Sequence, residues 1–120
     1  NWAVTGLLKS NFLDQSFKKF LNENEIFRKQ LIGCYDFQLN LSDEIIDYQL
    51  EISSESASVK KKKTIKSLVK IEIDDSNLMN LYKKNLFVAE ALIQERLKFT
   101  GTKKNIDKFS QILTIFLEQN

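Results

Sequence analysis

The clearest indication of the fold comes from residues 70–101, KIEIDDSNLMNLYKKNLFVAEALIQERLKFTG. The stretch opens with alternating apolar residues, continues with Asp74-Asp75, and then shows the spacing of two short helices. Acidic side chains favour a helix N-terminus, because the free N–H groups there carry partial positive charge. Leu97, Phe99 and Gly101 fit a brief strand that ends at the glycine. The stretch therefore predicts the order strand, helix, helix, strand.

Further helices are predicted on both sides of this stretch. After it, Thr102 can cap an amphipathic helix over residues 102–118. Before it, apolar residues recur near a period of 3.6 in residues 1–21. A second short helix then follows Asn22 or Asn24 and ends before Gly33. Residues 1–33 are thus expected to be a helical N-terminal part.

The apolar period changes to two in residues 34–73, which predicts four strands. The first two form an antiparallel hairpin whose turn is Ser42-Asp43-Glu44, with one apolar and one polar face. A polar third strand over residues 57–63 suits a sheet edge, and residues 65–73 form the fourth strand. Two helices in residues 74–95 and a fifth strand in residues 96–101 complete a single domain of 120 residues.

The composition excludes several classes of function. A net charge of +2 is too small to suggest nucleic-acid binding. The absence of His removes the usual general base and the commonest zinc ligand, and three Gly cannot make a glycine-rich phosphate loop. We therefore expect no catalytic residues, no metal and no cofactor. Asp43-Glu44 and Asp74-Asp75 are explained by a turn and a helix start.

Compartment and chain context give three more expectations. A single Cys, Cys34, fits a reducing compartment such as the cytoplasm, and no nearby positive charge is expected to activate its thiol. No apolar run reaches the length that spans a bilayer. The chain starts at Asn1 without Met, which suggests that it was trimmed or cut from a longer protein.

The stretch quoted above, together with the hairpin before it, resembles the sterol carrier protein type two family over residues 16–118. The matching features are the acidic cap with Leu78 and the Leu97-x-Phe99-x-Gly101 strand. Residues 94–97, QERL, resemble a branch of bacterial accessory proteins of ubiquinone biosynthesis. Two departures stand out. The family often has Gly before the last strand, where this chain has Gln94 and Glu95, and the C-terminus carries no peroxisomal tripeptide.

The resemblance implies an α+β fold in which four to five helices cover one face of a mostly antiparallel five-stranded sheet. It also implies an apolar tunnel between the layers that holds a lipid, sterol, fatty acyl or isoprenoid tail. The same residue types also build an ordinary core. Tyr35 or Tyr48 could point a hydroxyl into the tunnel or find a partner at the core margin. The candidate lining consists of Phe37, Leu39, Tyr48, Leu50, Leu78, Phe87, Leu92, Phe109, Ile112 and Phe116.

Two lysine clusters are candidates for transient contact with a membrane surface. They are Lys60, Lys61, Lys62 and Lys63, and the pair Lys103 and Lys104. Anionic headgroups attract such side chains. In a strand, however, alternate lysines face opposite sides, so a solvated sheet edge explains the first cluster as well.

The function expected from this resemblance is non-catalytic binding or transfer of an apolar ligand, with ligand exchange through movement of the helix that starts at Thr102. The alternative is a protein-interaction or accessory domain with a filled core, for example in isoprenoid quinone biosynthesis or appended to a larger enzyme.

Overall fold

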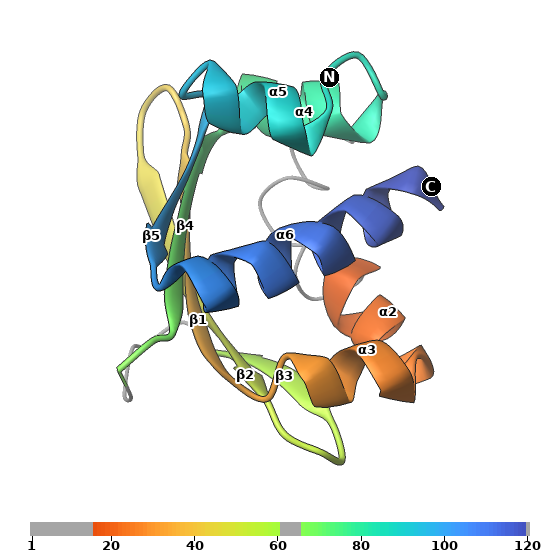
Figure 1. Ribbon diagram of the computed structural model, residues 1–120. Helices are drawn as coiled ribbons and strands as arrows, with labels where there is room; N and C mark the ends of the chain where they lie inside the picture. Colours follow the sequence, from red (N-terminus) through yellow and green to blue (C-terminus); the bar gives the residue numbers. More distant parts are fainter. Residues whose placement is uncertain (1–15, 61–65, 120) are drawn as a thin grey trace.

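A computed structural model describes residues 16–60 and 66–119 of the chain. Five strands form one sheet, and helices pack on one side of it (Figure 1). The strands are β1 (Gly33–Asn40), β2 (Ile45–Ile52), β3 (Ala57–Lys60), β4 (Val69–Asp74) and β5 (Leu97–Gly101). The described helices are α2 (Lys18–Glu23), α3 (Glu25–Gln30), α4 (Asp75–Tyr82), α5 (Val88–Ile93) and α6 (Lys103–Glu118). None of these helices is both long and apolar enough to span a membrane.

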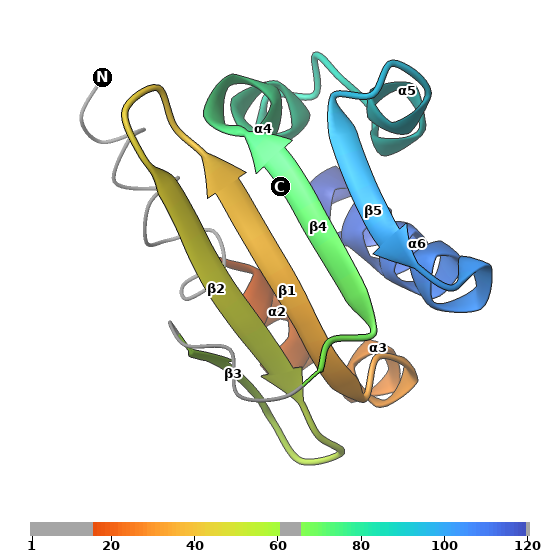
Figure 2. The ribbon, with the colours of Figure 1, turned by 90° about the vertical axis from the view of Figure 1, so that its left-hand side faces the viewer.

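The strand order across the sheet is β3-β2-β1-β4-β5. All neighbouring strands are antiparallel except β1 and β4, which run parallel. The prediction of an α+β fold with a mostly antiparallel five-stranded sheet is confirmed. The parallel pair arises because the chain leaves edge strand β3 and re-enters the sheet on the other side of the hairpin (Figure 2).

Alternation along each strand separates the two faces of the sheet. Tyr35, Phe37 and Leu39 of β1 are buried beneath the helices, whereas Cys34 and Asp36 lie on the opposite face. The described helices leave that second face uncovered (Figure 2). The core is therefore the layer between the inner face of the sheet and the helices, as a sheet with a single apolar face requires.

The predicted hairpin is confirmed, with Phe37 opposite Tyr48 in the register of β1 and β2. The fourth strand is shorter than predicted. It begins at Val69, which pairs with Tyr35, and residues 66–68 are outside it. Residue 65 and residues 61–63 of the third predicted strand lie outside the described residues, as do the helical residues predicted before residue 16.

The late start of β4 has a steric reason. The Leu68 side chain closely approaches the position that a Cβ would occupy on Gly33, and the Leu68 carbonyl closely approaches the same position on Gly101. Gly33 also has φ of +141°, which side chains rarely adopt. The Leu68 N–H donates to the Cys34 carbonyl at 2.7 Å. The two glycines thus let Leu68 cross from the loop into the sheet.

The helices begin close to the predicted positions, but not every predicted N-cap side chain makes a capping hydrogen bond. Thr102 caps α6 as predicted, and its hydroxyl accepts from the Asn105 N–H at 3.3 Å. Asp74 occupies the N-cap position of α4, but its side chain makes no capping hydrogen bond. Asn24 precedes α3 in the same way, and its amide donates to the Phe20 carbonyl instead.

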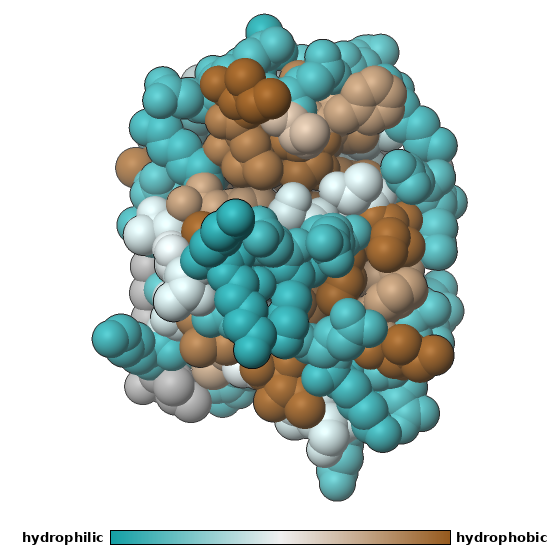
Figure 3. All heavy atoms as spheres, viewed as in Figure 1, coloured by the Kyte–Doolittle hydropathy of each residue, from teal (hydrophilic) through white to brown (hydrophobic). Residues whose placement is uncertain are grey.

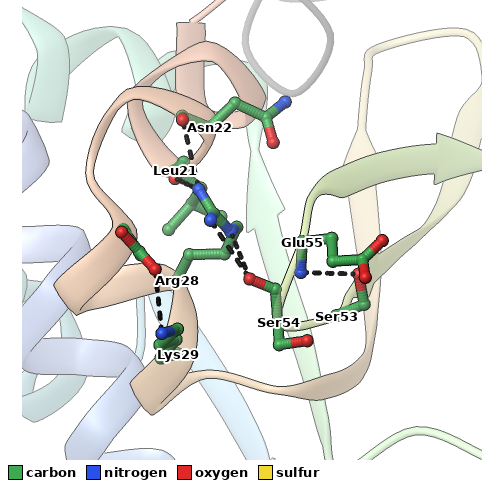
Figure 4. A network of polar contacts seen from close by, with 8 residues as sticks. Leu21, Asn22, Arg28, Lys29, Ser53, Ser54 and Glu55 are labelled. Carbon is green, nitrogen blue, oxygen red and sulfur yellow. Dashed lines mark hydrogen bonds and ion pairs between the residues drawn. The ribbon is translucent and has the colours of Figure 1, made fainter.

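A buried arginine ties the N-terminal helices to the sheet (Figure 4). The Arg28 guanidinium donates to the carbonyls of Leu21 and Asn22 at 3.2 and 3.1 Å, and to the carbonyl of Ser54 at 3.1 Å. The Asn22 side chain extends this attachment, because it both donates to and accepts from the backbone of Ala57. Polar side chains thus fasten α2 and α3 to the β2–β3 turn and to β3.

Candidate functional site

Nine of the ten residues predicted to line an apolar site join one hydrophobic cluster. Tyr48 and Leu92 are partly buried. Phe37, Leu39, Leu50, Leu78, Phe109, Ile112 and Phe116 are buried in it. The tenth, Phe87, is corrected by the structure: its side chain is 61% exposed because it precedes the first turn of α5. The buried face of α5 instead consists of Val88 and Ala91.

Aromatic rings fill the part of this layer between α2, α6 and the sheet. Phe109 packs against Tyr35 of β1 with ring centroids 5.0 Å apart, and against Phe17 at 5.8 Å. Phe116 lies about two helical turns further along α6. Its ring centroid is 5.2 Å from that of Phe17 and 5.3 Å from that of Phe20. Rings at these separations are in direct contact. In this part of the interior, Phe109 and Phe116 serve as core.

At the β5 edge, α5, β5 and α6 border an open groove of about 360 Å³. Leu97 at its floor is buried, while Leu92, Phe99 and Ile106 are partly exposed and pack on the core. Its remaining lining consists of Glu95, Lys98 and Thr100. Leu92 comes from α5, Phe99 from β5 and Ile106 from α6, so three elements meet around the opening.

Of the groove residues, sequence reasoning placed only Leu92 in a binding site. The Leu-x-Phe-x-Gly pattern predicts Leu97 and Phe99 as strand residues, and Ile106 lies in the amphipathic helix predicted over residues 102–118. The sequence does not show that these residues lie close together in space. Leu92 and Ile106 belong to different helices, and local periodicity cannot show that both flank the same strand.

A larger hollow, of about 540 Å³, lies at the start of β1 and the end of β2. Cys34 and Glu51 oppose each other there on the face of the sheet that the described helices leave open. The rest of the lining consists of Ile32, Gly33, Ile52, Ser53, Ser54, Ser56 and Ser58.

Of the residues that line this hollow, Ile52 alone belongs to the hydrophobic cluster. In the groove, Leu97 belongs to that cluster, and Leu92, Phe99 and Ile106 pack against it. The groove is therefore the better candidate for an apolar ligand.

Buried hydroxyl and thiol groups stay protonated near neutral pH. Burial raises the pKa of Tyr35 to about 12 and also raises the pKa of Tyr82 to about 12, which a hydrogen bond with Ser16 partly opposes. Burial and the carboxylates of Glu51 and Asp36 raise the pKa of the Cys34 thiol. A raised pKa disfavours the nucleophilic thiolate. This agrees with the inert thiol expected from the sequence.

The candidate charged groups are dispersed. Lys60 pairs with Glu51 at 2.9 Å on the sheet, and residues 61–63 lie outside the described part of the chain. Lys103 and Lys104 are exposed in the first turn of α6. Within the described residues, no group of three or more His, Cys, Asp or Glu side chains could hold a metal ion.

Comparison of this architecture with known proteins gives one consistent answer. No family model matches the sequence, and no curated protein matches it. Solved structures do match. The sterol carrier protein domain 2 of Helicoverpa armigera superposes with a TM-score of 0.68 at 17% identity, covering 85% of this chain and 86% of that one. The chain has the sterol carrier protein 2 fold.

Two other solved proteins with the sterol carrier protein 2 fold also match this chain. The palmitated SCP2L2 of Aedes aegypti matches with a TM-score of 0.59 at 11% identity, over 82% of this chain and 94% of that one. The UbiJ-SCP2 ubiquinone synthesis protein matches with a TM-score of 0.59 at 15% identity, over 99% and 93%. At these identities both matches show the shared fold.

Proposed function

We propose that this protein binds an apolar molecule, such as a fatty acyl or isoprenoid tail, between its sheet and helices, without catalysing a reaction. The observation that carries the proposal is the groove at the β5 edge, whose apolar walls are formed by Leu92, Leu97, Phe99 and Ile106. Affinity would come from apolar area removed from water. The palmitated protein of the same fold supports an acyl chain as the first ligand to test.

The position of the groove explains how a tail could enter. Its floor, Leu97, is one of the buried residues of the core, and Phe99 contacts Phe109 of α6 with ring centroids 5.9 Å apart. Displacement of the partly exposed Leu92, Phe99 and Ile106 would extend the groove inward along α6. A volume near 360 Å³ already lies within the range of about 300–1,000 Å³ typical of small-molecule sites.

A fluorescent fatty acyl probe titrated against the protein tests the proposal. Saturable binding is expected, and both Leu92→Trp and Ile106→Trp should weaken it at least about tenfold, because an indole would occupy the groove. Ile45→Trp is the matched control, since Ile45 is 62% exposed at the start of β2 and does not line the groove. Native mass spectrometry of the purified protein should also detect a co-purified apolar molecule. Absence of saturable binding would refute the proposal.

The second candidate is an interaction or accessory domain with a filled core, and the ring contacts around Phe17, Phe109 and Phe116 favour it. The two candidates differ in what the groove variants do. Protein partners that bind Ile106→Trp as well as the parent chain would support the second candidate, provided that neither chain binds the acyl probe.

A further inference from the structure

Helix α5 presents large apolar side chains to solvent beside the groove. Ile93 is 82% exposed, the highest value among the large hydrophobic side chains of the described residues, and Phe87 is 61% exposed. Figure 3 shows hydrophobic surface gathered over the end of the molecule where α4 and α5 lie. Single exposed apolar residues are ordinary on protein surfaces. Here one stands at the N-cap of α5 and the other is its last residue, and the helix borders an apolar groove, so chance exposure does not explain the pair.

Cationic side chains flank this helix on both sides. Lys83 and Lys84 precede it, Arg96 and Lys98 follow it, and all four are exposed. The two acidic residues in the same span are Glu90 and Glu95. The Glu90 carboxylate is engaged, because it accepts the Phe87 N–H at 3.1 Å. The surface around α5 thus combines exposed apolar groups with an excess of positive charge.

We propose that α5 docks reversibly on an anionic lipid surface, with Phe87 and Ile93 entering the bilayer interface and the flanking cations facing the headgroups. Exposed apolar side chains with cationic side chains beside them are what such a surface binds. The inference deepens the proposed function, since the groove would then open toward the bilayer. Leu92 lines the groove and adjoins Ile93, so a tail leaving the bilayer would reach the groove along α5.

A lipid surface fits these observations better than a protein partner does. A stable protein interface buries about 800 Å² on each side, whereas one large apolar side chain contributes only about 150–250 Å². Two such side chains are therefore too small a centre for a stable protein complex. They suffice for weak, reversible attachment when cations add to it.

Binding to phosphatidylcholine vesicles, prepared with and without phosphatidylserine, tests the proposal. The double variant Phe87→Ser/Ile93→Ser should bind phosphatidylserine vesicles at least about tenfold more weakly than the parent chain does. Serine suits position 87, which is an N-cap, so the helix should be retained. The matched control is Ile26→Ser/Ile45→Ser, which removes side chains that are 74% and 62% exposed on α3 and β2. The control should bind like the parent chain.

Charge variants show which cations attract the protein to anionic vesicles, those beside α5 or those at the start of α6. Lys83→Gln/Arg96→Gln should weaken binding only to vesicles with phosphatidylserine, and added salt should have the same effect on the parent chain. Lys103→Gln/Lys104→Gln should have little effect. If that pair abolishes binding and the α5 variant does not, the docking surface is at the start of α6 and the proposal fails.

The outcomes distinguish this inference from the proposed function. Phe87→Ser/Ile93→Ser should still bind the acyl probe in solution, because neither residue lines the groove. Unchanged vesicle binding by this variant would overturn the docking role of α5 and leave the proposed function intact. A concentration-dependent dimer of the parent chain that the same variant abolishes would also overturn it, in favour of a second copy as the occupant.

Discussion

Arg28 is the residue on which the attachment of α2 and α3 depends. Its side chain is 7% exposed, and its donors meet the carbonyl oxygens of Leu21, Asn22 and Ser54 (Figure 4). We expect Arg28→Met to lower the free energy of unfolding by roughly 2–4 kcal/mol, because buried carbonyls lose their donors. Lys29→Met, which removes an exposed pair with Glu25, should change the free energy of unfolding far less, because solvent screens that pair. Chemical denaturation measures both, and equal effects would contradict the prediction.

Glu95 carries backbone strain at the rim of the groove. Its φ is +60°, in the left-handed region that costs a residue with a side chain about 1–2 kcal/mol. Glu95→Gly should therefore raise the free energy of unfolding by roughly 0.5–1 kcal/mol, after the greater entropy of glycine in the unfolded chain is subtracted. Gln94→Gly is the control, since φ of −85° gives glycine no advantage there. Thermal denaturation should order the chains as Glu95→Gly, parent, Gln94→Gly.

At the scale of the element, α5 and α6 differ in how firmly they are held. Displacing α6 would expose five large apolar side chains at about 1.5–3 kcal/mol each, a sum comparable to the whole stability of a domain. Displacing α5 would expose Val88 and Ala91. Burial thus argues that α5, rather than the terminal helix expected from the sequence, moves when the groove opens.

Native-state hydrogen exchange tests this difference. Amides of α5 should exchange through local opening, at least about 100-fold faster than those in the middle of α6. The Ala91 N–H, which donates to the Phe87 carbonyl at 2.9 Å, reports on α5. Amides near Phe109 and Ile112 report on α6. Equal protection of the two helices would contradict the expected order of opening.

Helices and strands in which apolar residues recur over several periods were predictable from the sequence, and shorter elements were not. Eight-residue strands such as β1 and β2 display several alternations, and the four-residue connection 41–44 sets their pairing. The six-residue α5 displays too little of a period to show that Phe87 lies outside its buried face. The start of β4 depends on the approach of Leu68 to Gly33 and Gly101, which are distant in sequence. The groove likewise joins residues from three elements that are distant in sequence, so the sequence placed only one of them, Leu92, in a binding site.

At the scale of the molecule, the layer between sheet and helices has two parts. Around Phe17 and Phe109 it is filled by rings, and at the β5 edge it opens through partly exposed apolar side chains. One chain can thus hold α6 firmly through many buried side chains and hold α5 through fewer of them. The filled part should set the stability of the molecule, and the open part should set its ligand affinity.

The filled part predicts how stability depends on pH. Burial raises the pKa of Tyr35 and of Tyr82 from 10.0 to about 12, so the folded chain keeps two phenolic protons that the unfolded chain releases above pH 10. The unfolded state binds fewer protons in this range, and the free energy of unfolding should therefore fall as the pH rises from 10 toward 12. Below pH 10 the contribution of these tyrosines is fully present.

Chemical denaturation at a series of alkaline pH values measures this fall. The work is best done in Cys34→Ser, because the thiol also has a raised pKa and would act in the same direction. In that background Tyr35→Phe should flatten the dependence on pH, and Tyr35→Phe/Tyr82→Phe should flatten it further. Near-ultraviolet absorbance of the folded chain should show the same phenols ionising late. A dependence on pH that is identical in all three chains would mean that the alkaline loss of stability arises elsewhere, and that neither hydroxyl is held protonated by the core.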